Sequence, residues 1–258
     1  MNTAPRLDLL HAVEAIARAA GELILQVYGT DFDVRGKADA SPVTVADEQA
    51  EALITPALHL LTPGVPVVAE EAASRGDVPA ACACFWLVDP LDGTREFVLR
   101  NGEFTVNIGL VQDGQPVLGV VLAPALGCLY AGLPGVGAWL VGADGVRKAI
   151  RCRALPDAGA TLAVSPAYGD TERLQHWLQG RRIAQRVPAG SALKFGLLAA
   201  GQADVYPRFG RTMEWDTAAG HAVLLAAGGS VCNVAGQPLR YGKPGFENPD
   251  FIARGAGF

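Results

Sequence analysis

The 258-residue sequence is half hydrophobic and carries 21 basic and 26 acidic residues, for a net charge of −5. This length supports a large buried core, and the composition is typical of an ordinary globular protein without a membrane-spanning apolar run. The acidic balance and the lack of a Lys/Arg-rich run argue against a nucleic-acid polymer or an anionic membrane as partner.

The N-terminal region predicts a long helix followed by a loop. Apolar residues recur at three-to-four spacing from Leu9 to Val27, and Gly29 follows as a stop signal. Residues 30–42 predict a polar loop. This loop carries three further polar residues: Lys37, Asp39 and Ser41.

A second helix is predicted from a capping box formed by Thr44 and Asp47. Apolar residues continue on one side of this segment as far as Leu61. Pro56 predicts either a bend or a new helix start within it, because proline removes one backbone hydrogen bond. The Thr62-Pro63-Gly64 sequence ends the helix.

The middle third predicts a meander of short strands. Residues 103–110 alternate clearly, with Thr105 and Asn107 on the face opposite Val106 and Ile108. Asp113-Gly114 predicts a tight hairpin turn. The predicted strands cover residues 65–69, 86–88, 103–110, 117–123, 129–132, 138–141 and 146–151.

The pattern changes near residues 155–157, where strands begin to alternate with helices. Strands are predicted at 161–165, 183–187, 204–206 and 230–234, and helices at 170–178, 191–200 and 217–227. We therefore expect two lobes, residues 1–155 and 156–258, that share one site.

Acidic residues follow several of these strands. Glu70 comes directly after the strand at 65–69, the pair Asp89 and Asp92 follows the strand at 86–88, and Asp216 lies where a helix begins. Each has an ordinary structural alternative: an Asx turn for the Asp pair, a helix N-cap for Asp216, and an exposed acid for Glu70. Their coincidence with a Gly93-Thr94 step, whose backbone N–H groups suit a phosphate, favours a metal-and-phosphate site.

Oxygen ligands without His or Cys suit Mg²⁺ or Mn²⁺ better than Zn²⁺. Two such ions could hold a phosphate and activate a water, and Thr94 with Glu70 is the natural pair to orient that water. The predicted chemistry is hydrolysis of a phosphate ester without a covalent intermediate.

Other catalytic patterns are weaker. The four histidines are isolated, and no serine-hydrolase, P-loop or dinucleotide-binding motif occurs in a suitable context. Ser191 and Lys194 open the helix at 191–200 and could form a second anion site, or equally a Ser N-cap beside a surface Lys. The five cysteines are scattered and indicate free thiols in a reducing cytosol.

Several segments together resemble a known superfamily. Asp89-Pro-Leu-Asp-Gly-Thr94, the upstream Glu70-Glu71 and the downstream Trp215-Asp216-Thr-Ala-Ala219 resemble the Mg²⁺-dependent, lithium-sensitive phosphatases that include inositol monophosphatase. The sequence Arg95-Glu96-Phe97 and the segment Gly190–Phe195 look like the CysQ-type 3'(2'),5'-bisphosphate nucleotidases. Inositol monophosphatases typically carry Asn in place of Glu96.

The resemblance implies a mixed α/β (α+β) fold, layered as an αβαβα sandwich. Its metal ligands, for two or three Mg²⁺ ions, fall on Glu70, Asp89, the Leu91 carbonyl, Asp92 and Asp216. Its water-activating threonine falls on Thr94, supported by Asp47, and its phosphate donors on Gly93 and Thr94. Its substrate contacts fall on Glu70, Leu91, Asp92, Gly93, Thr94, Ser191, Lys194, Arg208 and Asp216.

The expected activity is removal of the 3'-phosphate from adenosine 3',5'-bisphosphate, and of the same group from its sulfated form, by a cytoplasmic enzyme. The substrate partner is thus a small phosphorylated nucleotide, and a homodimer is compatible with the resemblance. The alternatives are an inositol or sugar phosphatase of the same superfamily and, less well supported by the intact acidic set, a non-catalytic anion-binding protein.

Overall fold

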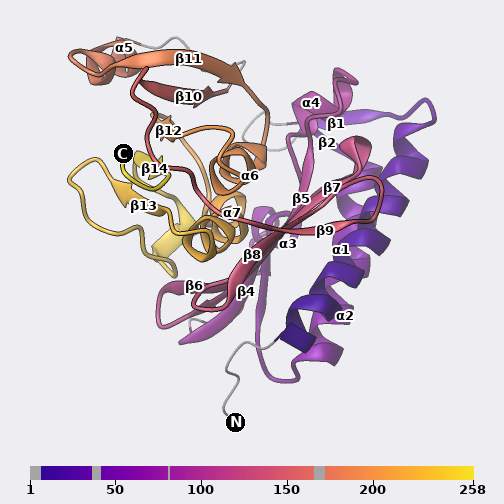
Figure 1. Cartoon of the computed structure of the whole chain (residues 1–258). Helices are drawn as coiled ribbons and strands as arrows, with labels where there is room; N and C mark the ends of the chain where they lie inside the picture. The colour runs from indigo at the N-terminus through magenta and orange to yellow at the C-terminus, as the bar shows by residue number, and fades with distance from the viewer. Residues whose placement is uncertain (1–6, 37–41, 81, 166–171) are drawn as a thin grey trace.

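The computed structural model describes residues 7–36, 42–80, 82–165 and 172–258. Within these residues the elements stack as helices, sheet, helices, sheet and helix (Figure 1). The predicted mixed α/β class and the αβαβα layering are confirmed. No helix in these ranges is long and apolar enough to cross a membrane.

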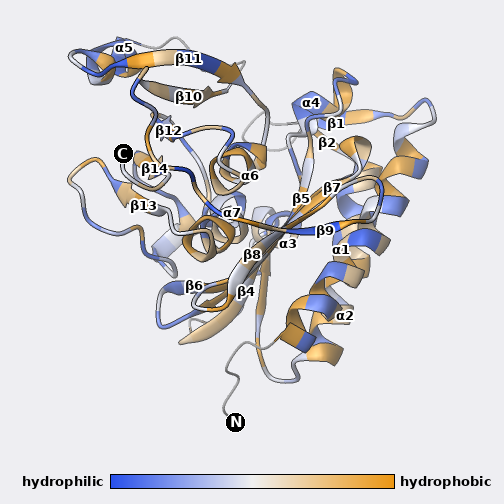
Figure 2. Ribbon diagram, viewed as in Figure 1, coloured by the Kyte–Doolittle hydropathy of each residue, from blue (hydrophilic) through white to orange (hydrophobic). Residues whose placement is uncertain are grey.

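The outer layer consists of α1 (Leu7–Tyr28) and α2 (Val45–Leu61). The side of α1 that faces the sheet is buried, whereas Figure 2 shows hydrophilic residues interspersed along both helices. The predicted capping box at Thr44 and Asp47 is present, and α2 continues through Pro56 as one helix. Pro56 therefore starts no new helix.

The predicted polar loop at 30–42 contains β1 (Val34–Gly36) and the first residue of β2 (Pro42–Thr44), and these two short strands pair antiparallel. Lys37, Asp39 and Ser41 lie outside the described residues. The prediction of a loop is thus wrong at residues 34–36 and at Pro42, because strands of three residues are too short to show a strand pattern in the sequence.

The first sheet has seven strands in sequential order. All neighbours are antiparallel except β3 and β4, which are parallel. The predicted meander is confirmed, and Asp113 and Gly114 both have positive φ, as a tight hairpin turn of this kind requires. The strands are β3 (Val67–Ala69), β4 (Cys84–Asp92), β5 (Thr105–Gln112), β6 (Gln115–Ala123), β7 (Cys128–Leu133), β8 (Gly137–Val141) and β9 (Arg147–Ile150).

Four short helical segments connect these strands and the later loops. They are α3 (Glu70–Ser74), α4 (Thr94–Val98), η1 (Pro124–Leu126) and η2 (Pro244–Phe246). The first two begin at residues that the sequence marks as site candidates, Glu70 and Thr94.

The middle layer consists of α6 (Leu193–Ala199) and α7 (Glu214–Ala226). Three glycines on neighbouring strands, Gly109, Gly119 and Gly132, let the backbone of α7 touch the sheet. A Cβ on Gly119 would lie 2.1 Å from the carbonyl oxygen of Ala219, and one on Gly132 would lie 2.4 Å from Cα of Val223. The absence of side chains at these positions fixes how closely α7 approaches the sheet.

The second sheet has the strand order β11-β10-β12-β14-β13, with β14 antiparallel to both of its neighbours. On its outer face α5 (Glu172–Leu178) packs Trp177 against Phe209 and Phe258. The last strand, β14, was not predicted. The strands are β10 (Ala160–Val164), β11 (Ile183–Pro188), β12 (Val205–Arg208), β13 (Ser230–Asn233) and β14 (Phe251–Arg254).

Candidate active site

An irregularity in β4 brings Asp89 and Asp92 to the same face of the sheet. Residues three apart on a regular strand point to opposite faces. Here Asp89 pairs with Asn107 and Asp92 pairs with Thr105, so three steps along β4 match two along β5. This bulge, at Pro90 and Leu91, reverses the side of Asp92 and places both carboxylates beside α7.

Asp92 is held by polar side chains from β5. The Asn107 amide donates to Asp92 Oδ2 at 3.2 Å, and the Thr105 hydroxyl approaches the same oxygen at 3.5 Å. Burial raises the pKa of Asp92 to about 6, although the positive charge of Lys194 and the Asn107 bond act in the opposite direction. The charge of Glu96 raises it further, so Glu96 also lies close to this group.

Asp89 is buried among other acids. It is 2% exposed, and its Oδ1 accepts the backbone N–H of Leu91 at 3.0 Å, so the Asx turn proposed as an alternative does form. Burial raises the pKa of Asp89 well above its usual range, and the neighbouring charges of Glu70, Asp92 and Asp216 raise it further. The turn and the acidic cluster therefore coexist.

Asp216 is the third residue of α7 rather than its N-cap. The helix begins at Glu214, three residues earlier than predicted, and Asp216 Oδ2 accepts the backbone N–H of Met213 at 2.8 Å. Burial raises the pKa of Asp216, as do the charges of Asp92 and Glu70. One oxygen of Asp216 thus helps to begin the helix while the carboxylate remains part of the acidic cluster.

This cluster fits a hard divalent cation by its chemistry. Buried carboxylates that raise one another's pKa are stabilised by a positive charge placed among them, and carboxylate oxygens are the ligands that Mg²⁺ prefers. Among the described residues, however, no group of three or more His, Cys, Asp or Glu side chains already has the arrangement of a metal site.

Thr94 is oriented by a buried carboxylate from the opposite helix layer. Its hydroxyl donates to Asp47 Oδ1 at 3.0 Å and also lies 3.3 Å from the Leu91 carbonyl oxygen. Asp47 is 1% exposed, and its Oδ2 accepts from both the backbone and the hydroxyl of Thr44, at 2.8 and 2.7 Å. The acid that begins α2 is thus the acid that holds Thr94.

Gly93 allows a loop from the second half of the chain to cross the turn. Its φ is 89°, and a Cβ here would lie 2.1 Å from Ser191 Oγ. The Ser191 hydroxyl lies within hydrogen-bond distance of the carbonyl oxygens of Asp92 and Glu103, at 2.8 and 2.7 Å. Ser191 itself has a φ of 48°, which is unusual for a residue other than glycine. The two halves of the chain therefore meet at Gly93.

Lys194 is buried, not on the surface, and α6 begins at Leu193, two residues later than predicted. The alternative of a Ser N-cap beside a surface Lys is wrong on both counts, since Ala192 is the N-cap residue. The Lys194 ammonium donates to the carbonyl oxygens of Ala189 and Ser191, at 3.0 and 2.7 Å. Burial lowers its pKa to about 8.

Arg208 lies on β12, and its guanidinium donates to the Arg211 carbonyl oxygen at 3.0 Å. Its charge lowers the pKa of both Lys194 and Asp216, which places it near the cluster. The structure thus brings all of the predicted site residues to one region. Asn107 and Thr105 were not predicted to lie in this region, because the sequence shows only which face of β5 they share.

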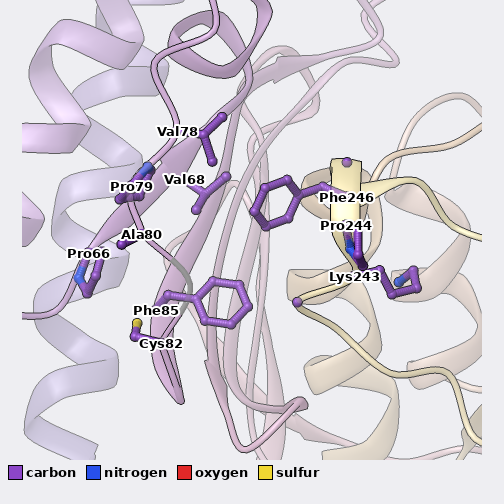
Figure 3. Close-up of a pocket in the computed structure, with 12 residues that line it drawn as sticks. Pro66, Val68, Val78, Pro79, Ala80, Cys82, Phe85, Lys243, Pro244 and Phe246 are labelled. Carbon is purple, nitrogen blue, oxygen red and sulfur yellow. The ribbon is translucent and has the colours of Figure 1, made fainter.

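A cavity of about 750 Å³ lies beside Glu70 and Asp216. Its wall includes two cationic and two aromatic side chains: Arg75, Arg211, Trp215 and Phe246. A second, apolar cavity of about 250 Å³ shares Val78, Gly245 and Phe246 with it. Figure 3 shows Phe246 facing Val68 and Val78 across that second cavity.

Comparisons with known proteins find similar sequences and folds over nearly the whole chain. The model of the inositol monophosphatase family matches residues 7–253. The 3'(2'),5'-bisphosphate nucleotidase CysQ of Escherichia coli K12 is 49% identical over 247 residues, which cover 94% of this chain and 98% of that protein. The CysQ protein of Buchnera aphidicola is 39% identical over 95% of this chain and 93% of that protein.

Solved structures resemble the fold over nearly the whole chain. CysQ from Bacteroides thetaiotaomicron superposes with a TM-score of 0.80 at 36% identity, covering 95% of this chain and 96% of that chain. An inositol monophosphatase from Thermotoga maritima gives a TM-score of 0.79 at 25% identity, covering 96% and 92% respectively.

Proposed function

The chain belongs to the inositol monophosphatase family, and from this membership and its acidic site we propose that it removes the 3'-phosphate of adenosine 3',5'-bisphosphate in a Mg²⁺-dependent reaction. It is a phosphoric monoester hydrolase of the 3'(2'),5'-bisphosphate nucleotidase type, the type named for relatives at 49% and 46% identity. The observation that carries the chemistry is that burial and the charges of neighbouring acids, Glu70 and Asp92 in both cases, raise the pKa of Asp89 and the pKa of Asp216.

We propose that the cations are held by Glu70, Asp89, the Leu91 carbonyl, Asp92 and Asp216. Two or three Mg²⁺ ions are proposed, with Mn²⁺ as a substitute. When bound, such ions neutralise phosphate charge and lower the pKa of a coordinated water.

The hydrogen bonds of Thr94 define its proposed role. A threonine hydroxyl has a single hydrogen, and here that hydrogen is directed to Asp47 Oδ1. Toward an attacking water Thr94 can then only accept, which orients the water's remaining lone pair away from the hydroxyl. We propose that Glu70 is the second partner of that water and receives its proton.

Substrate binding is proposed at both sides of the turn that carries Gly93. The backbone N–H groups of Gly93 and Thr94 lie at the start of α4, where helical N–H groups lack partners within the helix. Lys194 and Arg208 supply positive charge near the phosphates, and Ser191 is the third proposed contact. In this structure the Ser191 hydroxyl donates to the carbonyl oxygen of Asp92 in the turn.

The test is release of inorganic phosphate from adenosine 3',5'-bisphosphate, its sulfated form and inositol 1-phosphate at equal concentration. Higher kcat/KM with the adenosine bisphosphate is expected. Equal kcat/KM for the two substrates, or a higher value with inositol 1-phosphate, would contradict the proposal and favour an inositol or sugar phosphatase. Asp92→Asn is expected to remove activity, and hydrolysis at the wild-type rate would contradict the metal-based mechanism.

We further propose a cytoplasmic location and a homodimer. All five cysteines are free thiols, as a reducing compartment favours. Cell fractionation tests the location, and light scattering during gel filtration tests the oligomeric state. The division of the chain into lobes 1–155 and 156–258 also remains a proposal, tested by limited proteolysis near residue 155.

A further inference from the structure

Helix α2 contributes two buried acids one turn apart, and only the first is explained by the proposed chemistry. Asp47 contacts Thr94. Glu51, four residues later, is 6% exposed, and its Oε2 accepts the backbone N–H of Glu71 at 2.7 Å. Residues four apart lie on the same face of a helix. One face of α2 therefore contacts both segments that supply the water-orienting pair, Thr94 and Glu70.

The bond from Glu51 compensates for a missing cap. The N-cap residue of α3 is Ala69, which has no side-chain hydrogen-bonding group, and no side-chain cap is present there. The first N–H groups of a helix have no partner within it. Glu51 provides the acceptor from a helix 20 positions earlier in the sequence. The start of α3 is thus fixed by α2.

Glu51 also contacts the opposite end of α3. The Arg75 guanidinium, at the C-cap of the helix, donates to Glu51 Oε1 at 3.3 Å. One carboxylate therefore bridges the first turn and the C-cap residue of a five-residue helix. The Glu71 N–H belongs to the peptide unit that directly follows Cα of Glu70, so this bridge restricts the direction of the Glu70 side chain.

We infer that Glu51 is a positioning residue that holds Glu70 in place for cation binding. This inference rests on the proposed function only in taking Glu70 as a cation ligand. A buried carboxylate that accepts a backbone N–H fixes that backbone more firmly than a neutral acceptor does. Groups that orient a ligand from outside its coordination sphere typically change metal affinity by about 10–100-fold when they are removed.

Four substitutions separate positioning from general stability. Glu51→Ala removes the acceptor, and Glu51→Leu removes it while filling the space, which keeps the test valid if the alanine variant does not fold. Glu51→Gln retains an oxygen for the Glu71 N–H. Arg75→Met breaks the ion pair and leaves that bond intact.

Glu14→Ala is the matched control. Glu14 is also largely buried on the outer helix layer and is paired with Arg147 at 2.8 Å, but it contacts none of the proposed ligands. Its removal tests what loss of a buried ion pair does by itself.

The experiment measures Mn²⁺ binding to each full-length variant by electron paramagnetic resonance, together with the Mg²⁺ dependence of phosphate release and the melting temperature without metal. Glu51→Ala and Glu51→Leu are expected to weaken Mn²⁺ binding by about tenfold or more, while Glu51→Gln and Arg75→Met stay within about threefold. Glu14→Ala is expected to lower the melting temperature without changing Mn²⁺ affinity.

Wild-type Mn²⁺ affinity in both Glu51→Ala and Glu51→Leu would overturn the inference, as would an equal loss in Glu14→Ala. Failure of the proposed function has a different signature. In that case the wild-type protein binds Mn²⁺, the Glu51 series still ranks as expected, and adenosine 3',5'-bisphosphate is not hydrolysed.

Discussion

Replacing Asp47 with Asn tests whether Thr94 must accept a hydrogen bond from the attacking water. The two oxygens of Asp47 face different donors: Oδ1 faces the Thr94 hydroxyl, and Oδ2 faces the Thr44 backbone N–H and hydroxyl. A backbone N–H cannot reverse its role. The Asn side chain is therefore expected to keep its carbonyl oxygen toward Thr44 and turn its NH₂ group toward Thr94, which must then accept.

The expected loss of kcat follows from this reversal of the Thr94 hydrogen bond. With one lone pair of its oxygen engaged by the amide, the Thr94 hydroxyl can turn its hydrogen to the Leu91 carbonyl oxygen, 3.3 Å away, or to the water, so it no longer offers the water a fixed acceptor. Positioned proton-transfer groups contribute about 10²–10⁴-fold to rate, so kcat is expected to fall by about 10²–10³-fold with little change in KM. Two bonds to Thr44 also lose their charged acceptor, which costs about 2 kcal/mol of unfolding free energy.

The assay is steady-state phosphate release at saturating Mg²⁺, with urea denaturation on the same preparations. Asp47→Asn, Thr94→Ala and the double variant are compared. Because the two residues act as one unit, the double variant is expected to be no slower than the slower single variant. A kcat within threefold of wild type in Asp47→Asn, or fully multiplicative losses in the double variant, would refute this reasoning.

Three further predictions concern the fold and the cations. Gly119→Ala is expected to lower the unfolding free energy by about 3 kcal/mol, because the added Cβ meets a backbone oxygen, whereas Gly29→Ala, with only ordinary contacts, should change it little; equal effects in urea would contradict this. Burial raises the pKa of Asp204, but hydrogen bonds from Arg153 and Thr161 outweigh it and hold that pKa below its usual value. The contribution of ionised Asp204 to the unfolding free energy is therefore complete above about pH 5 and is lost as pH falls through the folded-state pKa. The difference in unfolding free energy between wild type and Asp204→Asn should therefore shrink below about pH 4, and a constant difference would contradict this. Chelation with EDTA should abolish phosphate release, Mg²⁺ should restore it and Li⁺ should inhibit it; activity that survives chelation argues against a cation-held phosphate.

The sequence predicts the acidic residues of the site because their spacing from buried strands is visible in it. What the spacing does not reveal is orientation. Asp89 and Asp92 are three residues apart and would point to opposite faces of a regular strand. Only the bulge against β5, between Asn107 and Thr105, brings them together, and it depends on pairing with a distant segment.

The burial of polar side chains is the other feature of the site that the sequence pattern does not reveal. Lys194 lies three positions after a serine in a helix-opening pattern, which is typical of an exposed N-terminus. In the structure Lys194 is buried, and the segment just before it supplies two acceptors for its ammonium, the carbonyl oxygens of Ala189 and Ser191. Likewise, Glu51 on α2 looks like any solvent-facing acid, since its partner, the Glu71 N–H, carries no side-chain signal in the sequence.

The three glycines beneath α7 give the site a spacing that is independent of side-chain size. Asp216 belongs to α7, whereas Asp89 and Asp92 belong to the sheet. At Gly109, Gly119 and Gly132 the backbone of α7 contacts the backbone of the sheet. Elsewhere in the core, a substitution that adds or removes a methyl group can change the distance between packed elements. At these three glycines there is no side chain to vary. The surrounding core can therefore change in sequence while the distance between the backbones that carry the two sets of carboxylates stays the same.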